Sequence, residues 1–243
     1  MHVPKALFLG LALAGVLGGC AEPVRRPPDT SYAEASAAAA AHAVTKDEFV
    51  AALGRFAKTT YRYTVEGNVT ADQRIDVTGA HDPGAGALSR TIKVTDGATT
   101  GTRELILVDK ALYLRTSERK RWARVDPDTF DPKSVFFLVN PADPNGLGDF
   151  ADAVAWVEQT GPGAYDGSFR VAKKDGGVFI PVGAPALSLS GSSGARFTAT
   201  ADTEGNVTSI VVMLRTYTGD LTLTTRFSDF GKPVVVTRPK VAA

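Results

Sequence analysis

The chain of 243 residues contains a single cysteine, Cys20, and this limits how its fold can be stabilised. One thiol cannot form a disulfide within the chain, so burial of apolar side chains has to hold the fold together. Cys20 follows a short apolar run, residues 6–17, which is preceded by the basic residue Lys5. About a dozen residues are too few for a hydrocarbon core that needs roughly 20 residues of helix, so residues 1–19 are predicted to be a signal peptide.

The segment Leu17-Gly18-Gly19-Cys20 resembles the lipobox of bacterial lipoproteins. The resemblance implies that the thiol of Cys20 carries a diacylglyceryl group, that cleavage makes Cys20 the first residue, and that its amino group is acylated. Two or three acyl chains hold a protein stably on a bilayer, whereas one does so only marginally. The implied partner is therefore a membrane, with the protein lipid-anchored at Cys20 on the extracytoplasmic face of the cell membrane. The alternative is an ordinary signal peptide followed by an incidental cysteine.

Residues 20–44 are predicted to be a flexible tether. They lack a periodic apolar pattern, and their Arg25-Arg26-Pro27-Pro28 segment favours extended polyproline geometry. Residues 45–243 have the length and apolar content of a single globular domain. Removing residues 1–19 takes Lys5 and no acidic residue from 27 basic and 26 acidic residues, so the mature chain is formally neutral. This balance argues against nucleic acid as a partner.

The domain is expected to begin with an amphipathic helix. Thr45 and Glu48 form a capping-box pattern, and Phe49, Leu53 and Phe56 follow at spacings of four and three residues. These spacings place the three apolar side chains on one face of a helix that ends near residue 58.

A series of strands is predicted next and again near the end of the chain. In the first of them Tyr61, Tyr63 and Val65 alternate with polar residues, which is typical of a half-buried strand. Short connections such as Asp82-Pro83-Gly84 favour antiparallel neighbours. Further strands are expected at residues 74–78, 88–95, 103–108, 112–116, 122–125, 168–172, 178–182, 195–201, 207–217, 221–227 and, as a short edge strand, 234–236.

Residues 131–161 are predicted to interrupt the strands with a helical insert. It contains the uninterrupted apolar run 135–139, and a second amphipathic helix is expected from Leu147 to Gly161. The apolar face of that second helix would carry Leu147, Phe150, Val154 and Val157. Helix, strands, insert and strands follow one another without βαβ alternation, so the fold class is α+β with a large antiparallel sheet.

No constellation of residues typical of catalysis is found in the sequence. Of three histidines only His81 falls in the predicted domain, beside a turn where a solvated side chain is expected. No His, Cys or Asp spacing indicates a metal site, and no Gly-x-Ser-x-Gly segment is present with an available histidine. We therefore expect no metal, no cofactor and no enzymatic activity. An envelope hydrolase with two converging carboxylates is the remaining alternative.

Three stretches of the domain carry a further resemblance. They are Phe49-x-x-Ala52-Leu53 with Tyr61-Arg62-Tyr63, the pair Leu112-Tyr113-Leu114 and Trp122-Ala123-Arg124-Val125-Asp126, and the ending Phe227-Ser228-Asp229-Phe230-Gly231-Lys232-Pro233-Val234-Val235-Val236-Thr237-Arg238-Pro239. Between residues 45 and 239 the chain resembles the actinobacterial LppX/LprA/LprF/LprG lipoproteins, whose fold is similar to that of LolA. The resemblance implies a curved antiparallel sheet (a half-barrel) packed on one side by helices, with an apolar cavity between them. Several members of that family carry acylated lipids or glycolipids across the cell envelope.

Two apolar segments are the main candidates for lining such a cavity. Residues 135–139 are apolar all round, and residues 210–214 are apolar on both faces of a strand, so both segments need to be covered. The candidate ligand-binding residues are Val135, Phe136, Phe137, Val139, Phe150, Trp156, Phe179, Val211 and Met213. The alternative is that these side chains interdigitate as an ordinary core.

We therefore predict a monomeric envelope lipoprotein that binds or transports an apolar ligand, such as a lipid or lipoglycan, in a cavity between sheet and helices. The alternative is a non-enzymatic interaction or sensor module that uses the same fold without a bound lipid and contacts an envelope protein. An internal cavity would favour the first function, whereas an exposed apolar patch or a free sheet edge would favour the second.

Overall fold

The computed structural model describes Glu34 and residues 45–70, 72–125, 139–171, 178–179, 182–183, 187–188, 194–216 and 219–241. All of them except Glu34 belong to one compact unit, Ala38–Ala243. The predicted signal peptide, Cys20, nearly all of the predicted tether, and Val135, Phe136 and Phe137 lie outside the described residues.

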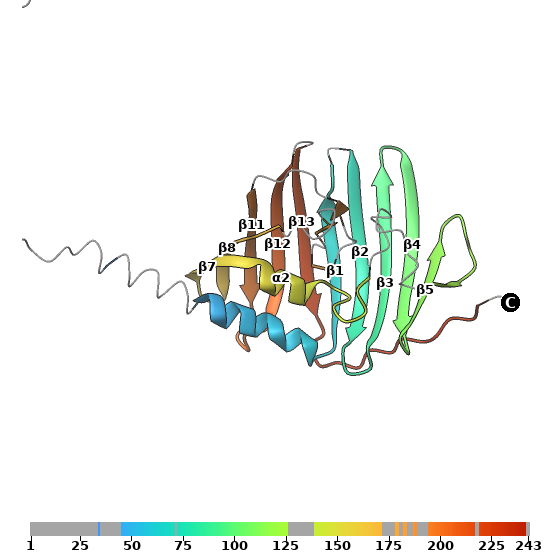
Figure 1. Cartoon of the computed structure of the whole chain (residues 1–243), viewed down its shortest axis with the longest axis horizontal. Helices are drawn as coiled ribbons and strands as arrows, with labels where there is room; N and C mark the ends of the chain where they lie inside the picture. Colours follow the sequence, from blue (N-terminus) through green and yellow to red (C-terminus); the bar gives the residue numbers. More distant parts are fainter. Residues whose placement is uncertain are drawn as a thin grey trace, which may run out of the picture. The chain divides into compact units, whose positions relative to one another are not determined.

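The unit is built on one open antiparallel sheet of eleven strands (Figure 1). In space the strands follow the order β6-β5-β4-β3-β2-β1-β13-β12-β11-β8-β7, so β6 and β7 form the two edges. The strands are β1 (Tyr61–Asn68), β2 (Gln73–Asp82), β3 (Ala87–Asp96), β4 (Thr99–Val108), β5 (Ala111–Thr116), β6 (Ala123–Val125), β7 (Val154–Gly161), β8 (Ala164–Phe169), β11 (Gly194–Ala201), β12 (Val207–Thr216) and β13 (Gly219–Ser228). A separate two-stranded sheet pairs β9 (Val178–Phe179) with β10 (Leu187–Ser188).

The chain builds this sheet from the centre to one edge and then from the other edge back to the centre. β1 to β6 follow one another as a meander. The helix α2 (Leu147–Ala153) then precedes β7 at the opposite edge, and β8, β11, β12 and β13 return toward β1. The first and last strands therefore pair, in a register that runs from Arg62↔Ser228 to Asn68↔Thr222.

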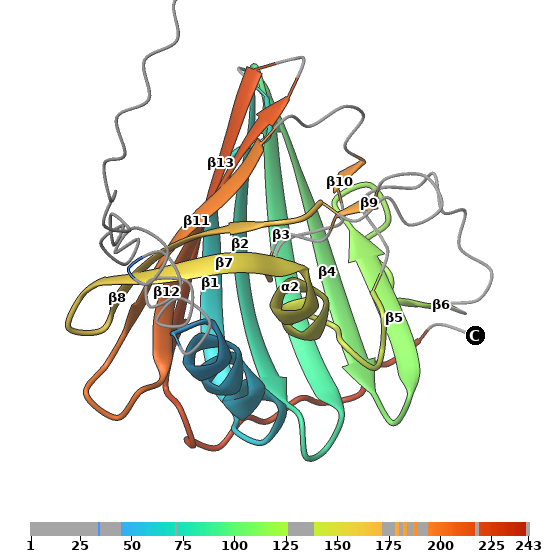
Figure 2. The same ribbon diagram turned by 60° about the vertical axis from the view of Figure 1, so that its left-hand side comes forward.

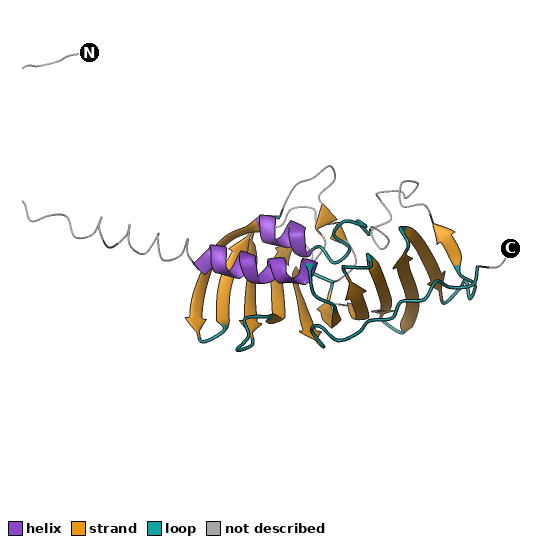
Figure 3. Ribbon diagram, turned by 90° about the horizontal axis from the view of Figure 1, so that it is seen from below, coloured by secondary structure: helices purple, strands orange, loops and turns teal. Residues whose placement is uncertain are grey.

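The predicted alternation gives the sheet two different faces. Along β1, Tyr61, Tyr63 and Val65 are buried, whereas Arg62 and Thr64 are exposed. We call the face that carries the buried side chains the inner face. Figures 1 and 3 show that both described helices lie on this face, over the half of the sheet that contains β7, β8 and β11 to β13.

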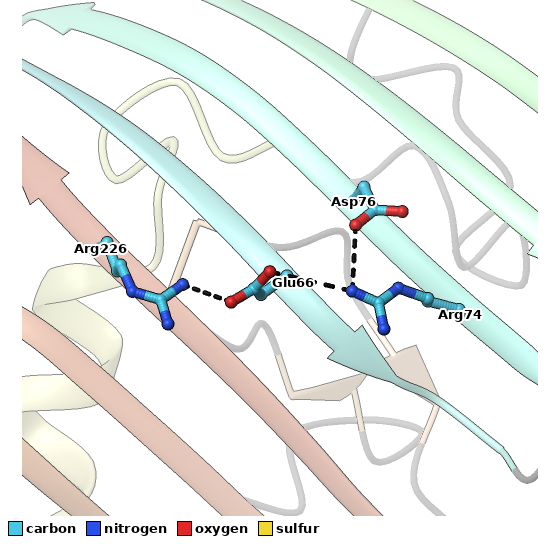
Figure 4. Close-up of polar contacts among 4 residues, drawn as sticks. All are labelled: Glu66, Arg74, Asp76 and Arg226. Carbon is cyan, nitrogen blue, oxygen red and sulfur yellow. Dashed lines mark hydrogen bonds and ion pairs between the residues drawn. The ribbon is translucent and has the colours of Figure 1, made fainter.

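The opposite, outer face is polar at the centre of the sheet. Arg226 contacts Glu66, whose other oxygen lies 3.8 Å from Arg74, and Arg74 lies 3.5 Å from Asp76 (Figure 4). The side chains are about half exposed, and the two positive and two negative charges balance. Exposed pairs of this kind contribute at most about 1 kcal/mol each, so their main effect is to keep this face in water.

The predicted N-terminal helix is confirmed. Residues 45–54 are helical, and the 3-10 turn η1 (Arg55–Ala57) continues the helix. Phe49, Leu53 and Phe56 are all buried, as their spacing predicts. Thr45 is itself helical, so it does not occupy the cap position that the capping-box pattern suggested.

The prediction of a second helix is wrong beyond Ala153. α2 ends there, and the next residues form the edge strand β7. Val154 and Val157 are both buried although they lie three residues apart. The reason is a bulge between Val154 and Trp156, which inserts one extra residue and restores the same face after three positions instead of two. This spacing imitates a helical period in the sequence.

Three predicted strands near the C-terminal half also differ from the structure. Residues 234–236 form no strand; Val234 and Val236 are half-buried while Val235 is 85% exposed. The strand predicted at residues 168–172 is β8, which begins earlier, at Ala164. The strand predicted at residues 178–182 is the two-residue β9.

The predicted fold class is confirmed in its main features. The unit is a curved, open antiparallel sheet with helices on one face, and Figure 2 shows β7 and β8 running almost across the direction of β2 to β4. The helical layer is small, since the described residues contain only two short helices. The sheet therefore dominates the fold.

Two glycines on the inner face let large aromatic rings lie flat against the sheet. A Cβ at Gly79 would lie 2.3 Å from Cζ of Tyr63, and one at Gly167 would lie 2.5 Å from Cζ of Phe197. Gly79 pairs with Tyr63 on one side and with Arg90 on the other. The missing side chain thus allows Tyr63 to reach across β2 to β3.

We expect Gly79→Ala to lower the free energy of unfolding by about 2 kcal/mol, because the methyl group displaces the Tyr63 ring from a well-packed position. Urea denaturation measures this change. Gly54→Ala is the matched control: its Cβ would meet nothing within 4 Å, and in helical geometry it should be neutral or stabilising by up to about 1 kcal/mol. Equal effects of the two substitutions would contradict the role assigned to Gly79.

Candidate functional site

The half of the inner face beneath the helices is filled by aromatic side chains. Phe49 stacks on Phe197 of β11 at a centroid distance of 5.2 Å. Phe150 of α2 meets Phe197 edge-on at 5.2 Å and Phe169 of β8 at 5.5 Å. Because these rings interdigitate and both Phe49 and Phe150 are 0% exposed, the helices and this half of the sheet form an ordinary core.

The other half of the inner face, over β2 to β5, is lined mainly by buried apolar side chains, and Arg90 of β3 lies among them. The strand registers place its side chains in neighbouring rows, for example Leu88, Leu107 and Leu112 on β3, β4 and β5. Neither described helix lies over β3 to β5 (Figures 1 and 3). The buried apolar residues of this surface, which we call the apolar half-face, are Ile75, Val77, Leu88, Ile92, Leu105, Leu107 and Leu112.

A buried polar network crosses the inner face from β1 to β3. Arg90 donates from Nε to the Tyr63 hydroxyl at 2.8 Å and from Nη2 to the Pro144 carbonyl oxygen and Asn145 Oδ1, each at 2.6 Å. Asn145 in turn donates to the Tyr61 hydroxyl at 2.8 Å. The network ties the loop before α2 to β1 and β3, and Arg90 and Asn145 are nearly inaccessible to solvent.

The network holds a positive charge within the protein. Among the described residues no carboxylate lies within ion-pair distance of Arg90, whose partners there are neutral oxygens. Burial raises the pKa of the Tyr61 and Tyr63 hydroxyls, so both stay neutral. A buried cation without an anion is costly, and it makes this end of the apolar half-face attractive to a polar or negatively charged group.

His81 extends the network toward the surface. Its Nδ1 lies 3.1 Å from the Tyr61 hydroxyl, and its ring meets Tyr61 edge-on at 5.4 Å. The expectation of a solvated loop histidine is wrong, because His81 lies on β2 with its side chain on the inner face and is 8% exposed. Tyr61 and His81 form part of the floor of a groove of about 410 Å³ between the N-terminal helix and α2.

The loop that covers His81 is fixed by its own carboxylate. Asp143 Oδ1 accepts the Leu147 N–H at 3.0 Å, and Oδ2 accepts the Asp149 N–H at 2.9 Å. These bonds satisfy free N–H groups in the first turn of α2, because Gly146 at the cap position has no side chain. The Asp143 carboxylate therefore holds the groove wall in place.

The structure divides the predicted ligand-binding residues between the two faces. Phe150 and Val139 belong to the buried core on the inner face. Trp156, Val211 and Met213 lie on the outer face: Met213 pairs with the exposed Arg196, and Trp156 pairs with Ser168 in the same row. Phe179 is on β9, and its side chain is not described. These residues therefore do not converge on one site.

The polar network was not predicted from the sequence. Arg90 occupies an inward position of β3 between Leu88 and Ile92, where the alternation calls for an apolar residue. That break in the pattern was the available signal. Tyr61 and Tyr63 gave none, since aromatic side chains at inward positions usually pack as core.

None of the described helices is long and apolar enough to cross a membrane. Within the same residues no group of three or more His, Cys, Asp or Glu side chains is placed to hold a metal ion.

Comparisons with known proteins do not assign the chain to a family. No family model matches it. No curated protein matches it either. Among solved structures it is similar to the hypothetical protein CT021 from Chlamydia trachomatis, with a TM-score of 0.32 and 8% sequence identity over 75% of this chain and 92% of that chain. A similarity of this level carries no functional argument, so function has to be argued from the residues themselves.

The His81 environment predicts a specific pH dependence of stability. Burial, and then the charge of Arg90, lower the pKa of His81 to about 4, whereas the pKa of a histidine in an unfolded chain is about 6.5. Between these two pKa values the unfolded state binds more protons than the folded state, so the free energy of unfolding falls as the pH drops through this range. Above the range the contribution of neutral His81 to stability is fully present.

We expect the wild type to lose about 2–3 kcal/mol of unfolding free energy relative to His81→Gln between about pH 7 and pH 4.5. Glutamine cannot titrate, so subtracting the two profiles removes the contribution of Asp82, Asp143 and every other carboxylate. Urea denaturation at several pH values provides the measurement. Parallel pH profiles for the two proteins would show that His81 is not held neutral.

Proposed function

We propose that the chain is a membrane-anchored envelope lipoprotein whose domain binds an apolar ligand, a lipid or a lipoglycan, at the apolar half-face. The observation that supports this most directly is the set of apolar side chains over β2 to β5, which are buried although neither described helix lies over β3 to β5. The resemblance to the LppX/LprA/LprF/LprG lipoproteins and to the lipobox supports the same assignment.

The proposed site lies beside the helices rather than under them. The aromatic contacts of Phe49 and Phe150 with Phe197 close the space between the helices and β11. Over β2 to β5, burial of an acyl chain would contribute about 0.8 kcal/mol per methylene before the costs of ordering and association. Burial of several methylene groups of a long acyl chain is thus enough for a stable complex.

The polar network provides the second half of the proposed site. A lipid has a polar or anionic headgroup that has to stay hydrated or hydrogen-bonded. Arg90, which pairs with Leu105, carries a positive charge that suits such a headgroup, and Asn145 accepts a hydrogen bond from Arg90. We propose that acyl chains lie along the leucine rows with the headgroup at Arg90.

The first test is mass spectrometry of organic extracts of the full chain carrying Cys20→Ser, produced in an exporting host. We expect a co-purified lipid near one mole per mole of protein. Leu105→Gln should reduce that amount at least about tenfold, because an amide then replaces an apolar side chain in the leucine row next to Arg90, where the acyl chain would lie. Ile106→Gln is the matched control, since Ile106 is the next residue of β4 and lies on the outer face.

Thermal unfolding of both variants establishes that they fold. If Leu105→Gln does not fold, the wild type still decides the question through its own bound lipid and its uptake of a dansyl-labelled fatty acid. A wild type that contains no lipid and takes up no labelled fatty acid would contradict the proposed function.

The anchor is tested separately. We expect the full chain to incorporate radiolabelled palmitate and to partition into the detergent phase of a Triton X-114 extract, because acyl chains on Cys20 dominate its partitioning. Cys20→Ala should lose both properties, and Ala21→Ser should keep them. Palmitate incorporation that persists in Cys20→Ala would rule out this anchor.

A non-enzymatic interaction module is the second candidate, and two observations favour it. Beneath the helices the core is closed, as expected for a domain that carries no ligand. Among the described strands, none pairs with the outer edge of β6 or of β7 in the open sheet, although Trp122, just before β6, forms a single bridge with Val241. A stable wild type that is free of lipid would shift the assignment to this function.

A further inference from the structure

The outer face carries a second concave site, on the opposite side of the sheet from the apolar half-face. It is a groove of about 410 Å³ over β1 to β4, within the size range of small-molecule pockets. Two rows of side chains that cross the strands form its floor: one contains Ala80, Ser89 and Ile106, and the other contains Thr64, Thr78 and Thr91. Because most of these side chains are small, the floor lies low between larger residues at the ends.

One end of the groove has an aromatic wall. Trp122, just before β6, lines the groove, and the guanidinium of Arg115 lies 4.8 Å from the centre of its ring. Arg115 is fixed in turn by Glu104, which accepts from both its Nε and its Nη2. A cation held against a tryptophan in this way orders the ring before any ligand arrives.

The other end of the groove is basic and equally constrained. Arg62 lines it together with Ser228. The Arg62 Nε lies 3.5 Å from Asp229 Oδ2, and Lys232 Nζ donates to the other oxygen of the same carboxylate at 2.5 Å. The groove therefore has an acid, Glu104, near the aromatic wall and a base, Arg62, at the opposite end, so that its charges balance.

Hydroxyl groups line the floor between these ends. Within the described part of the chain, the hydroxyls of Thr64, Thr78 and Ser89 have no side-chain hydrogen-bond partner. A hydroxyl can both donate and accept, so the three groups offer hydrogen bonds of either kind to a ligand.

This combination selects among ligand classes. An acyl chain would desolvate the hydroxyls, Arg62 and Glu104 without replacing their hydrogen bonds. Glu104 would repel an anion in the groove, and Arg62 would repel a cation. An extended peptide needs free backbone groups, and β1 to β4 are each paired on both sides. A neutral polyhydroxylated ring can contact a tryptophan through its C–H groups. Its hydroxyl groups can form hydrogen bonds with the threonine and serine hydroxyls of the floor.

We propose that the groove over β1 to β4 binds a saccharide. Trp122 supplies the apolar contact for the sugar ring, and Thr78 and Ser89 hydrogen-bond to its hydroxyls. The site is independent of the apolar half-face, because the sheet separates the two, so either proposal can fail without the other.

The chain contains two tryptophans, so replacing Trp156 allows the fluorescence of Trp122 to be measured alone. In the full chain carrying Trp156→Phe, the only remaining indole is the one that lines the groove. We expect its fluorescence to change in a saturable manner on titration with at least one of glucose, mannose, galactose, maltose, cellobiose and lactose. No saturable change with any of these sugars would overturn the proposal.

A matched pair of variants in the same background locates the binding. Thr78→Val removes a floor hydroxyl at nearly constant shape, and we expect it to weaken binding of the responding sugar about tenfold. Thr198→Val makes the same change at an exposed position of β11 outside the groove and should leave the affinity unchanged. Equal affinities in the two variants would overturn the assignment to this groove.

Discussion

The pairing of β1 with β13 is the constraint on which the rest of the structure depends. It joins two segments that are more than 150 residues apart, and its register from Arg62↔Ser228 to Asn68↔Thr222 sets which side chains of both strands face inward. Without it the meander β1 to β6 and the strands β7 to β13 would be two separate sheets, each with a further unprotected edge. Closing so long a loop costs conformational entropy, which the interactions between the paired strands have to offset. The packing of Phe56, Tyr61 and Phe227 across the junction contributes to this.

Glycine and aromatic residues act together on the inner face. Gly79 and Gly167 have no side chain, and the rings of Tyr63 and Phe197 occupy the space above them. At Gly79 this arrangement brings the Tyr63 hydroxyl to Arg90 and so completes the buried network with Asn145. At Gly167 it brings Phe197 between Phe49 and Phe150, which fixes both helices to the sheet. The closed core beneath the helices and the buried polar network thus have the same structural origin.

The two proposed sites follow from the different chemistry of the two faces. The inner face over β2 to β5 is lined mainly by leucine, isoleucine and valine, with the buried Arg90 among them, which suits acyl chains and a headgroup. The outer face over β1 to β4 carries hydroxyls between Arg62 and Glu104, with Trp122 at one end, which suits a sugar ring. A lipoglycan contains both kinds of chemistry, but each site can be tested by itself since β1 to β4 lie between them.

The sequence by itself determined most of the strands and the first helix, because alternation and the spacing of Phe49, Leu53 and Phe56 are local patterns that burial confirms. It also determined that no disulfide stabilises the fold, since Cys20 stands alone. Local patterns failed where tertiary structure changed the period: the bulge at Val154 imitated a helix, and His81 beside a turn was buried by a loop that is more than 60 residues away in sequence. Only the tertiary structure decided that Phe150 and Met213 lie on opposite faces and that Arg90 meets Asn145. Those relations depend on strand order and register, which are set by contacts between distant segments and leave no periodic signal in either segment alone.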